Sequence, residues 1–527
     1  MAAGLVAAVA VAASDGLVLG FGDAPSHVIL PRRVLDSVDP SLAQLGTHWA
    51  PLFHVLQIPI VWIEPLYRGG GSGTIVSAVA SLVTGLYLYR LARLLDCGRP
   101  AAFVAVAVLA ASPSFLYAGV VPMQPALIMA TTTANVYYLT RWALTGSGAS
   151  LLAAGVALTL ATLTHFDTWI LAPLELVVVI AVARGGAPSR FRVEATTLLW
   201  LLASGYGVFL FLLMNLMIYG DPFHFPALLE TPRDRVGPRE GLIPIESTEA
   251  LLHYPRAAWH TAGPVLALAG VLGIALFVWR WRRSPHRLIP LLLLYPFAFY
   301  TFQAATSGSW IVPAERLGDW ENLRYALTIL PALAFFTAAG IRRAIPLAIA
   351  TLAIVASAAV MVASERVASW EEAKVEGESR KDLVHAAEWL GARAPGGRVL
   401  IPVPDRSIDR FELKSGLPAR AFVDPTATDA WRAALAEPAS VRGSGIRWVV
   451  TFVHAPEGRP HPHKAQDEKA EVNATHRATF LRILRETGAR LCYTKRSPVN
   501  PTVRIYSLGR DCGPSEGPRN RASAAVL

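Results

Sequence analysis

Long apolar runs alternate with short polar connections from the start of the chain to about Ala363, where the long runs stop. A helix of roughly 20 apolar residues spans the hydrocarbon core of a bilayer, so each run is a candidate transmembrane helix. We therefore expect a polytopic α-helical membrane protein. The pattern predicts eleven spans, near Ala2–Gly20, Thr74–Leu94, Ala101–Tyr117, Ala126–Trp142, Leu151–Thr164, Trp169–Ala183, Thr196–Ile218, Gly263–Trp279, Leu288–Phe302, Tyr325–Ala339 and Ala344–Ala363.

Arginines gather in every second connection between these spans, and short loops rich in Lys and Arg are typically cytoplasmic. An odd number of spans then places the N-terminus in the cytoplasm and the C-terminus on the extracytoplasmic side. The Ala-rich start lacks the positive n-region of a cleavable signal peptide, so we expect an uncleaved first helix. The arginines concerned are Arg90, Arg93, Arg99, Arg141, Arg184, Arg190, Arg192, Arg280, Arg282, Arg283, Arg287, Arg342 and Arg343.

After Ser364 the apolar runs shorten and the share of charged residues rises. Short β-rich runs at 398–403, 447–452 and 502–506 alternate with helical patterns at 381–390, 429–436 and 479–486. Such alternation is typical of a small α/β domain. We expect a transmembrane domain over residues 1–363 and a soluble extracytoplasmic α/β domain over residues 364–527. Within the latter, Glu457–Thr475 is predicted to be an exposed loop and the tail from Gly513 to be disordered.

Composition supports membrane insertion and narrows the class of partner. The chain is 53% hydrophobic and 16% charged, with a mean hydropathy of +0.41, which is too apolar for an ordinary soluble protein. The cytoplasmic arginines account for most of the net charge of +10, so we expect membrane lipids and no nucleic acid as partners. Cys97 is predicted to lie in a cytoplasmic connection, whereas Cys492 and Cys512 are predicted to lie in the external domain. These two cysteines form either a disulfide or two free thiols.

Polar residues at the external ends of four predicted helices are the main candidates for chemistry, because a carboxylate is costly inside lipid. Asp23 follows the first helix, Gln124 begins the fourth, Asp167 follows the fifth and Arg324 begins the tenth. We expect these four residues to line one cavity. The alternative for a single Asp after a helix is a cap or a solvated loop residue.

The long external loop Phe21–Gly73 carries three further candidates, each with two interpretations. His27 is either a metal ligand or an ordinary loop histidine. Arg32 and Arg33 either hold a phosphate or face anionic lipid at the membrane surface.

An ordered series of segments along the chain resembles a known superfamily. The segments are Gly22–His27, Arg32–Ser37, Gln44–Trp49 with Pro51, Thr164–Trp169, Tyr219–Pro222 and Asn322–Tyr325. In this order they resemble the C-type (GT-C) glycosyltransferases and, more narrowly, bacterial and archaeal relatives of the dolichyl-phosphate-mannose protein mannosyltransferases, glycosyltransferase family 39. The resemblance covers about Gly20–Gly340.

The resemblance implies a multi-pass enzyme that takes a sugar from a polyprenyl phosphate in the outer leaflet. The sugar passes to a glycan, lipid or protein acceptor with inversion at the anomeric carbon. Asp23 matches the acid of the family's first external loop and is the implied catalytic base. One carboxylate is enough, because the acceptor hydroxyl must lose a proton whereas the phosphate leaves as a stable anion.

A cation should stabilise the leaving phosphate, supplied by an arginine or by a bound metal. A divalent metal is therefore a possible cofactor, with Asp23 and His27 as candidate ligands. The candidates for substrate binding are His27, Arg32, Arg33, Gln124, His165, Asp167, Asn322, Arg324 and Tyr325.

Two positions depart from the family pattern. Where relatives usually read Met-Thr-Glu-Pro this chain has a neutral Gln124, and where they read Thr-Arg-Tyr-Asp it has His165 in place of the arginine. The missing acid leaves three alternatives: a phosphate clamp of arginines alone, a different acceptor, or lost activity. The leading hypothesis is a hexosyltransferase-like enzyme of the cell membrane. The others are an inactive relative that acts as a binding subunit and a lipid or solute transporter.

Overall fold

The computed structural model describes residues 1–46, 48–185, 189–224, 247–306, 314–316, 319–394, 396–402, 407–453, 478, 480–496, 502–509 and 512. It divides into two compact units. Unit 1 holds the described residues of Met1–Val34 and Leu42–Glu378, and unit 2 those of Leu35–Ser41, Ser379–His463 and Asp467–Leu527. The loop predicted at Glu457–Thr475 and the tail predicted from Gly513 lie outside the described residues.

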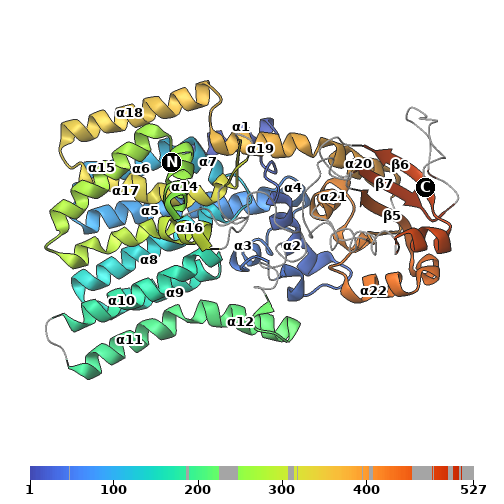
Figure 1. Ribbon diagram of the computed structural model, residues 1–527, viewed down its shortest axis with the longest axis horizontal. Coiled ribbons are helices and arrows are strands. Elements are labelled where there is room, and N and C mark those ends of the chain that lie inside the picture. Colours follow the sequence, from blue (N-terminus) through green and yellow to red (C-terminus); the bar gives the residue numbers. More distant parts are fainter. Residues whose placement is uncertain are drawn as a thin grey trace. The chain divides into compact units, whose positions relative to one another are not determined.

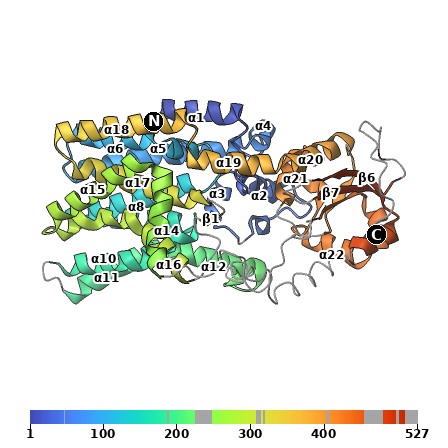
Figure 2. The same ribbon diagram turned by 45° about the horizontal axis from the view of Figure 1, so that its top comes forward.

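Unit 1 is built almost wholly of helices, and Figures 1 and 2 show its long helices lying side by side. The α-helices are α1 (Ala2–Ser14), α2 (Ala24–Asp36), α3 (Leu52–Val55), α4 (Glu64–Arg68), α5 (Gly71–Leu94), α6 (Arg99–Ala111), α7 (Pro113–Ala118), α8 (Pro125–Thr145), α9 (Gly148–Thr162), α10 (Leu171–Arg184), α11 (Arg190–Ser204), α12 (Tyr206–Tyr219), α14 (Ser247–Ala262), α15 (Pro264–Trp281), α16 (Tyr295–Thr306), α17 (Leu330–Gly340), α18 (Ala344–Ala363) and α19 (Ala368–Ser379). Four 3-10 helices, η1 (Leu42–Leu45), η2 (Phe166–Ile170), η3 (Pro285–Leu294) and η4 (Leu323–Ile329), and a short hairpin of β1 (Ala314–Arg316) and β2 (Asp319–Glu321) complete the unit.

Within the described residues, six helical segments are long and apolar enough to cross a membrane. They are Gly71–Leu94, Phe166–Arg184, Pro264–Trp281, Pro285–Ala305, Leu323–Gly340 and Ala344–Ser379. The pair α11 and α12, bent by 44°, makes a seventh if it counts as one span, and α1, α6 and α9 are apolar but shorter. The polytopic helical fold is thus confirmed, while the number of eleven spans remains a prediction.

Two predicted spans are interrupted, and each break has a local cause. The span near Ala101–Tyr117 breaks at Ser112, whose backbone is extended before Pro113 and whose hydroxyl caps α7. The span near Thr196–Ile218 breaks at Gly205, which separates α11 from α12. Glycine has no Cβ and tolerates such a bend at low cost.

The first predicted span, Ala2–Gly20, is wrong at its end, because α1 stops at Ser14. Gly16 follows with a φ of 69°, a left-handed conformation that glycine adopts freely at helix ends. The chain beyond is held by Tyr117, whose hydroxyl donates to the carbonyl of Leu17 at 2.8 Å. A new helix, α2, then begins directly after Asp23.

The helix α17 forms the centre of unit 1, since all its residues are buried. It packs against α15, α6 and α5. Glycines let α15 approach it closely, because a Cβ at Gly273 would collide with the carbonyl of Phe336. Since η4 runs directly into α17, this packing fixes the segment that carries Arg324.

Unit 2 has a mixed sheet whose described strands follow the order β4-β3-β5-β7-β6. β3 pairs in parallel with β4 and β5, and β7 pairs antiparallel with β5 and β6. The presence of a C-terminal α/β domain is confirmed. The strands are β3 (Arg398–Leu400), β4 (Phe422–Val423), β5 (Ile446–Val453), β6 (Arg490–Lys495) and β7 (Thr502–Ser507), and the helices are α20 (Lys381–Arg393), α21 (Ile408–Ser415), α22 (Thr428–Ala436), η5 (Ala419–Ala421) and η6 (Pro438–Ser444).

The central strand β5 is apolar because both of its faces are buried. Trp448 and Val450 join one apolar cluster, whereas Ile446 and Val449 join another. This run of β-branched and aromatic residues made β5 predictable from the sequence. The edge strand β6, none of whose residues is buried, was not predicted.

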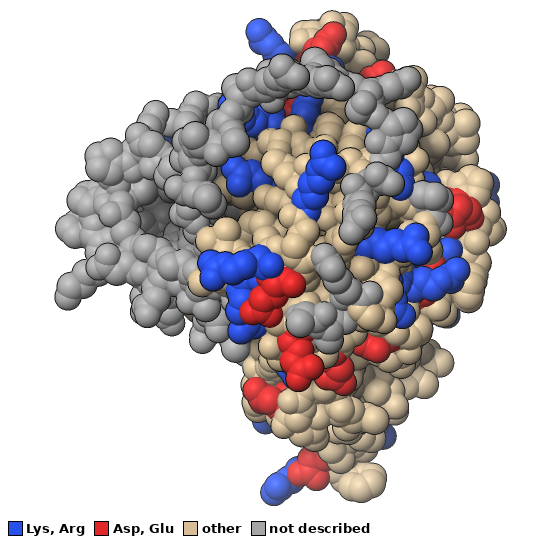
Figure 3. All heavy atoms as spheres, turned by 90° about the vertical axis from the view of Figure 1, so that its right-hand side faces the viewer, with Lys and Arg blue, Asp and Glu red and all other residues tan. Residues whose placement is uncertain are grey.

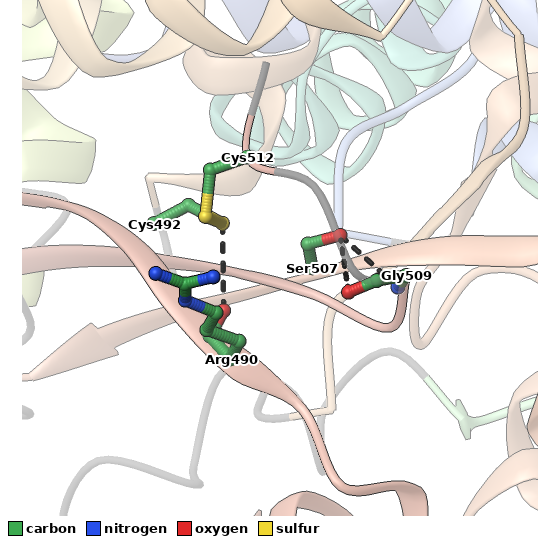
Figure 4. The surroundings of a disulfide bond; sticks show 5 residues. All are labelled: Arg490, Cys492, Ser507, Gly509 and Cys512. Atoms are coloured by element: carbon green, nitrogen blue, oxygen red, sulfur yellow. Dashed lines mark hydrogen bonds between the residues drawn. A yellow bond between two sulfur atoms is a disulfide. The ribbon is translucent and has the colours of Figure 1, made fainter. Parts of the chain in front are cut away.

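A disulfide joins Cys492 on β6 to Cys512, which follows β7 (Figure 4). Cys97 is a buried free thiol in unit 1. Of the two alternatives left open by the sequence, the structure therefore contains the disulfide.

Charged residues of both signs occur on the face shown in Figure 3. Its described Lys and Arg side chains are scattered over uncharged surface, and Asp and Glu side chains lie beside several of them. The net positive charge of the chain is thus not gathered into one patch on the described part of this face.

Candidate active site

A small pocket in unit 1 collects polar side chains from segments far apart in the sequence. Its walls come from the start of α2, the start of α8, the residue before η2, and η4. The lining residues are Asp23, His27, Trp49, Met123, Gln124, Pro125, Ile128, His165, Arg324, Tyr325 and Thr328. Six predicted site residues thus meet here, whereas Arg32, Arg33, Asp167 and Asn322 do not line the pocket.

An ion pair joins Asp23 to Arg324 across 301 positions of sequence. Nη2 of Arg324 lies 2.7 Å from Oδ2 of Asp23, and the guanidinium also lies over the ring of Tyr325. The arginine side chain is 10% exposed, whereas the aspartate side chain is 34% exposed. The carboxylate is therefore charge-balanced and still accessible.

The start of α2 gives Asp23 a second source of electrostatic stabilisation. The carbonyl of Asp23 accepts the first helical hydrogen bond, from the amide of His27 at 3.1 Å. The carboxylate thus lies at the N-terminal end of the helix, where the helix dipole favours negative charge.

A buried histidine pair lies at the pocket, where His27 is a lining residue and His54 is not. Nδ1 of His27 and Nε2 of His54 are 2.8 Å apart, and both side chains are almost fully buried. Gln57 holds the pair by donating to the carbonyl of His27 at 3.0 Å. Burial lowers the pKa of His27 well below its usual value and that of His54 to about 3, so both rings are neutral at pH 7.

His165 also lines the pocket, and Asp167 contacts its ring without lining the pocket. Nδ1 of His165 is 2.9 Å from Oδ1 of Asp167, and the hydroxyl of Tyr300 donates to Oδ2 at 3.0 Å. Asp167 is fully buried and orients the imidazole, so its observed contacts are those of a supporting residue.

Gln124 is the residue just before α8, which Pro125 begins. The residue is only 5% exposed, and its side-chain amide nitrogen has no hydrogen-bond partner among the described residues. A buried amide donor without a partner is costly, so this group is suited to meet a ligand.

The segment that carries Arg324 is fixed by a carboxylate that the sequence did not single out. Asn322 has a φ of 61°, and Glu372 of α19 accepts hydrogen bonds from the amides of Asn322 and Leu323 at 2.5 and 3.1 Å. Nothing in the sequence near Glu372 marked it, because its partner Asn322 is 50 positions away.

The two arginines of the loop predicted to be external, Arg32 and Arg33, do not line the pocket. Nη1 of Arg32 donates to the carbonyl of Val61 at 2.7 Å, and Nη2 pairs with Glu64 at 3.3 Å. Arg33 is buried. The proposed role of either residue in holding phosphate remains a prediction.

The residues at the pocket do not fit a divalent cation. Asp23 is paired with Arg324, Nδ1 of His27 is engaged by His54, and Gln124 is neutral. In the part of the chain that the structure describes, no three His, Cys, Asp or Glu side chains are grouped so as to hold a metal ion.

Comparison with known proteins gives a consistent family and fold. The family described as dolichyl-phosphate-mannose-protein mannosyltransferase matches residues 68–214. This range includes Gln124, His165 and Asp167 but neither partner of the Asp23–Arg324 pair. No curated protein matches the sequence.

The solved structures of ArnT from Cupriavidus metallidurans resemble this chain throughout. The form bound to undecaprenyl phosphate has a TM-score of 0.58 at 13% identity, covering 98% of this chain and 100% of the other. The apo form has a TM-score of 0.52 at 13% identity, covering 87% and 88%. The archaeal oligosaccharyltransferase AglB from Archaeoglobus fulgidus, in complex with an inhibitory peptide and a dolichol-phosphate, has a TM-score of 0.46 at 14% identity over 96% and 74%.

The ArnT likeness establishes a shared fold, and the family match covers the helices on two walls of the pocket. Taken together, these findings show that the chain shares the fold of ArnT and that its residues 68–214 are similar to the dolichyl-phosphate-mannose-protein mannosyltransferase family.

Proposed function

We propose that this protein transfers a sugar from a polyprenyl-phosphate-linked donor to an acceptor at the extracytoplasmic face of the membrane, with inversion. The observation that carries the proposal is the accessible Asp23 carboxylate beside the buried guanidinium of Arg324. The donor class is supported by the undecaprenyl phosphate bound to the ArnT structure with the same fold.

In the proposed reaction, the oxygen of an acceptor hydroxyl attacks the anomeric carbon of the sugar. The bond from that carbon to the phosphate oxygen breaks, and its electron pair leaves with the polyprenyl phosphate. The hydroxyl proton passes to the carboxylate of Asp23, whose Oδ2 already accepts a hydrogen bond from Arg324. The guanidinium of Arg324, a permanent cation, stabilises the phosphate as negative charge develops on it.

A test of this function compares Asp23→Asn with Asp15→Asn in membranes supplied with a lipid-linked sugar donor. We expect Asp23→Asn to lower the transfer rate about 100-fold or more, because the amide accepts no proton. Asp15 is an exposed residue after α1 and does not line the pocket, so its variant should transfer at the wild-type rate. Undiminished transfer by Asp23→Asn would remove the proposed base.

A catalytically inactive binding subunit is the second candidate, because Gln124 replaces the acid that relatives carry at this position. It predicts that the wild-type chain binds undecaprenyl phosphate but transfers no sugar from any polyprenyl-phosphate donor. Detectable transfer by wild type that Asp23→Asn abolishes would exclude it.

A further inference from the structure

The buried His27–His54 pair has one hydrogen between its two facing nitrogens. At 2.8 Å, one ring must donate and the other accept, and both rings are neutral for the reason given above. The ring that donates determines whether Nε2 of His27 carries a hydrogen. This nitrogen is the one on His27 that remains available to a ligand in the pocket.

The other nitrogen of His54 settles this choice. Nδ1 of His54 is buried without a hydrogen-bond partner among the described residues. A buried N–H without an acceptor is rarer in proteins than an unmet acceptor, so this nitrogen carries the lone pair. His54 therefore has its hydrogen on Nε2 and donates it to Nδ1 of His27.

The tautomer of His27 follows from this donation. With its Nδ1 acting as an acceptor, the neutral ring has its hydrogen on Nε2. Because His27 lines the pocket and His54 occupies its Nδ1, Nε2–H is the group that His27 offers to a ligand.

The pocket thus presents three hydrogen-bond donor groups. His27 offers one N–H, the amide of Gln124 offers an unmet N–H, and Arg324 adds a positive guanidinium. Asp23 is the one carboxylate among the lining residues, and it is already paired with Arg324. Such a set of donors is suited to the oxygens of an anion.

We propose that Nε2–H of His27 and the amide of Gln124 donate hydrogen bonds to the phosphate of the lipid carrier, and that His54 is the positioning residue that fixes the tautomer of His27. This inference rests on the proposed function, which supplies the lipid phosphate. It assigns the neutral Gln124 a binding role in place of the missing acid.

The test measures binding of undecaprenyl phosphate to the full-length protein in detergent, with a chelator present. In His27→Gln the amide nitrogen can occupy the place of Nε2, whereas in His27→Asn it can reach only the place of Nδ1. We expect His27→Gln to keep most of the affinity and His27→Asn to lose about tenfold or more. His286→Asn, at the start of η3 and away from the pocket lining, is the control.

Gln124→Glu supplies an independent arm, because a carboxylate in place of the amide repels the phosphate. We expect the affinity for undecaprenyl phosphate to fall about tenfold or more. An unchanged or higher affinity in the presence of chelator would contradict the role assigned to Gln124. Competition with inorganic phosphate shows whether the lipid tail is also needed, since a headgroup site alone would bind both equally well.

The possible outcomes separate the two proposals. If wild type does not bind undecaprenyl phosphate, the proposed function fails. If wild type binds it but His27→Asn binds better than His27→Gln, the contact with His54 is merely structural and the inference fails. Should the His27 variants not fold, ¹⁵N spectra of histidine-labelled wild type decide, since hydrogen on Nδ1 of His27 would overturn the inference.

Discussion

At the scale of single residues, the pocket has a charged pair of side chains next to a neutral pair. Asp23 and Arg324 provide one charge of each sign, and beside them His27 and His54 are kept neutral by burial, which lowers the pKa of each. A protonated His27 would add positive charge next to Arg324. The neutral pair therefore leaves the guanidinium as the main cation for a substrate.

This neutrality predicts how stability depends on pH. His54 has a pKa of about 3 when folded and 6.5 when unfolded, so the unfolded chain takes up a proton first as the pH falls. Its contribution to stability is complete above pH 6.5 and is lost progressively below that value. Between pH 7 and pH 5 we expect a loss of about 2 kcal/mol from His54 alone.

The measurement compares the thermal unfolding temperature of wild type and His54→Gln in detergent at the two pH values. The wild-type temperature should fall more steeply towards pH 5, because the glutamine does not titrate. Parallel pH profiles for the two proteins would show that His54 is not held neutral.

Sequence reasoning at this scale found residues but not their partners. Asp23, Gln124 and Arg324 stood out because polar groups at helix ends are costly near lipid, and they meet in one pocket. His54 and Glu372 did not, because each matters through a contact 27 or 50 positions away that only tertiary packing creates.

At the scale of elements, the geometry of the pocket depends on two short segments that follow interruptions. α2 begins after α1 has ended at Ser14, and η4 begins after Asn322 turns the chain with a φ of 61°. Apolar periodicity predicts the long helices well, yet it does not show such interruptions. They depend on individual residues such as Gly16, which allow the backbone to turn.

Glu372 is expected to stabilise the start of η4. We predict that Glu372→Ala lowers kcat/KM for sugar transfer about tenfold or more, because two amides lose their acceptor oxygens and Arg324 loses its fixed position. Glu372→Gln, which retains one acceptor oxygen, should have an intermediate effect.

The control for this prediction is Glu371→Ala, an exposed neighbour on the same helix. Equal activity of the Glu371 and Glu372 variants would show that α19 does not position Arg324. The binding assay with undecaprenyl phosphate provides a second measurement of the same effect.

At the scale of the whole molecule, the arginine pattern and the disulfide agree about sidedness. Disulfides persist outside the cytoplasm, and Cys492–Cys512 lies in the domain that the arginine pattern predicts to be external. We predict that, in a Cys97→Ser background, Cys492→Ser exposes the thiol of Cys512 to a membrane-impermeant maleimide in intact cells.

The matched control is Ala149→Cys in the same background, with both external cysteines also replaced by serine. Ala149 is exposed in the first turn of α9, beside the connection predicted to be cytoplasmic from Arg141, so its cysteine should react only after the cells are permeabilised. The reverse labelling pattern would invert the proposed topology and place the pocket on the wrong face for an outer-leaflet donor.

The ion pair between Asp23 and Arg324 has a consequence for biosynthesis. Arg324 is synthesised 301 positions after Asp23, and most of the hydrophobic helices of unit 1 lie between them in the chain. In a growing polypeptide, Asp23 therefore lacks this ion-pair partner until Arg324 has been synthesised. If the proposed function holds, transfer begins only after the segment that carries Arg324 has been synthesised.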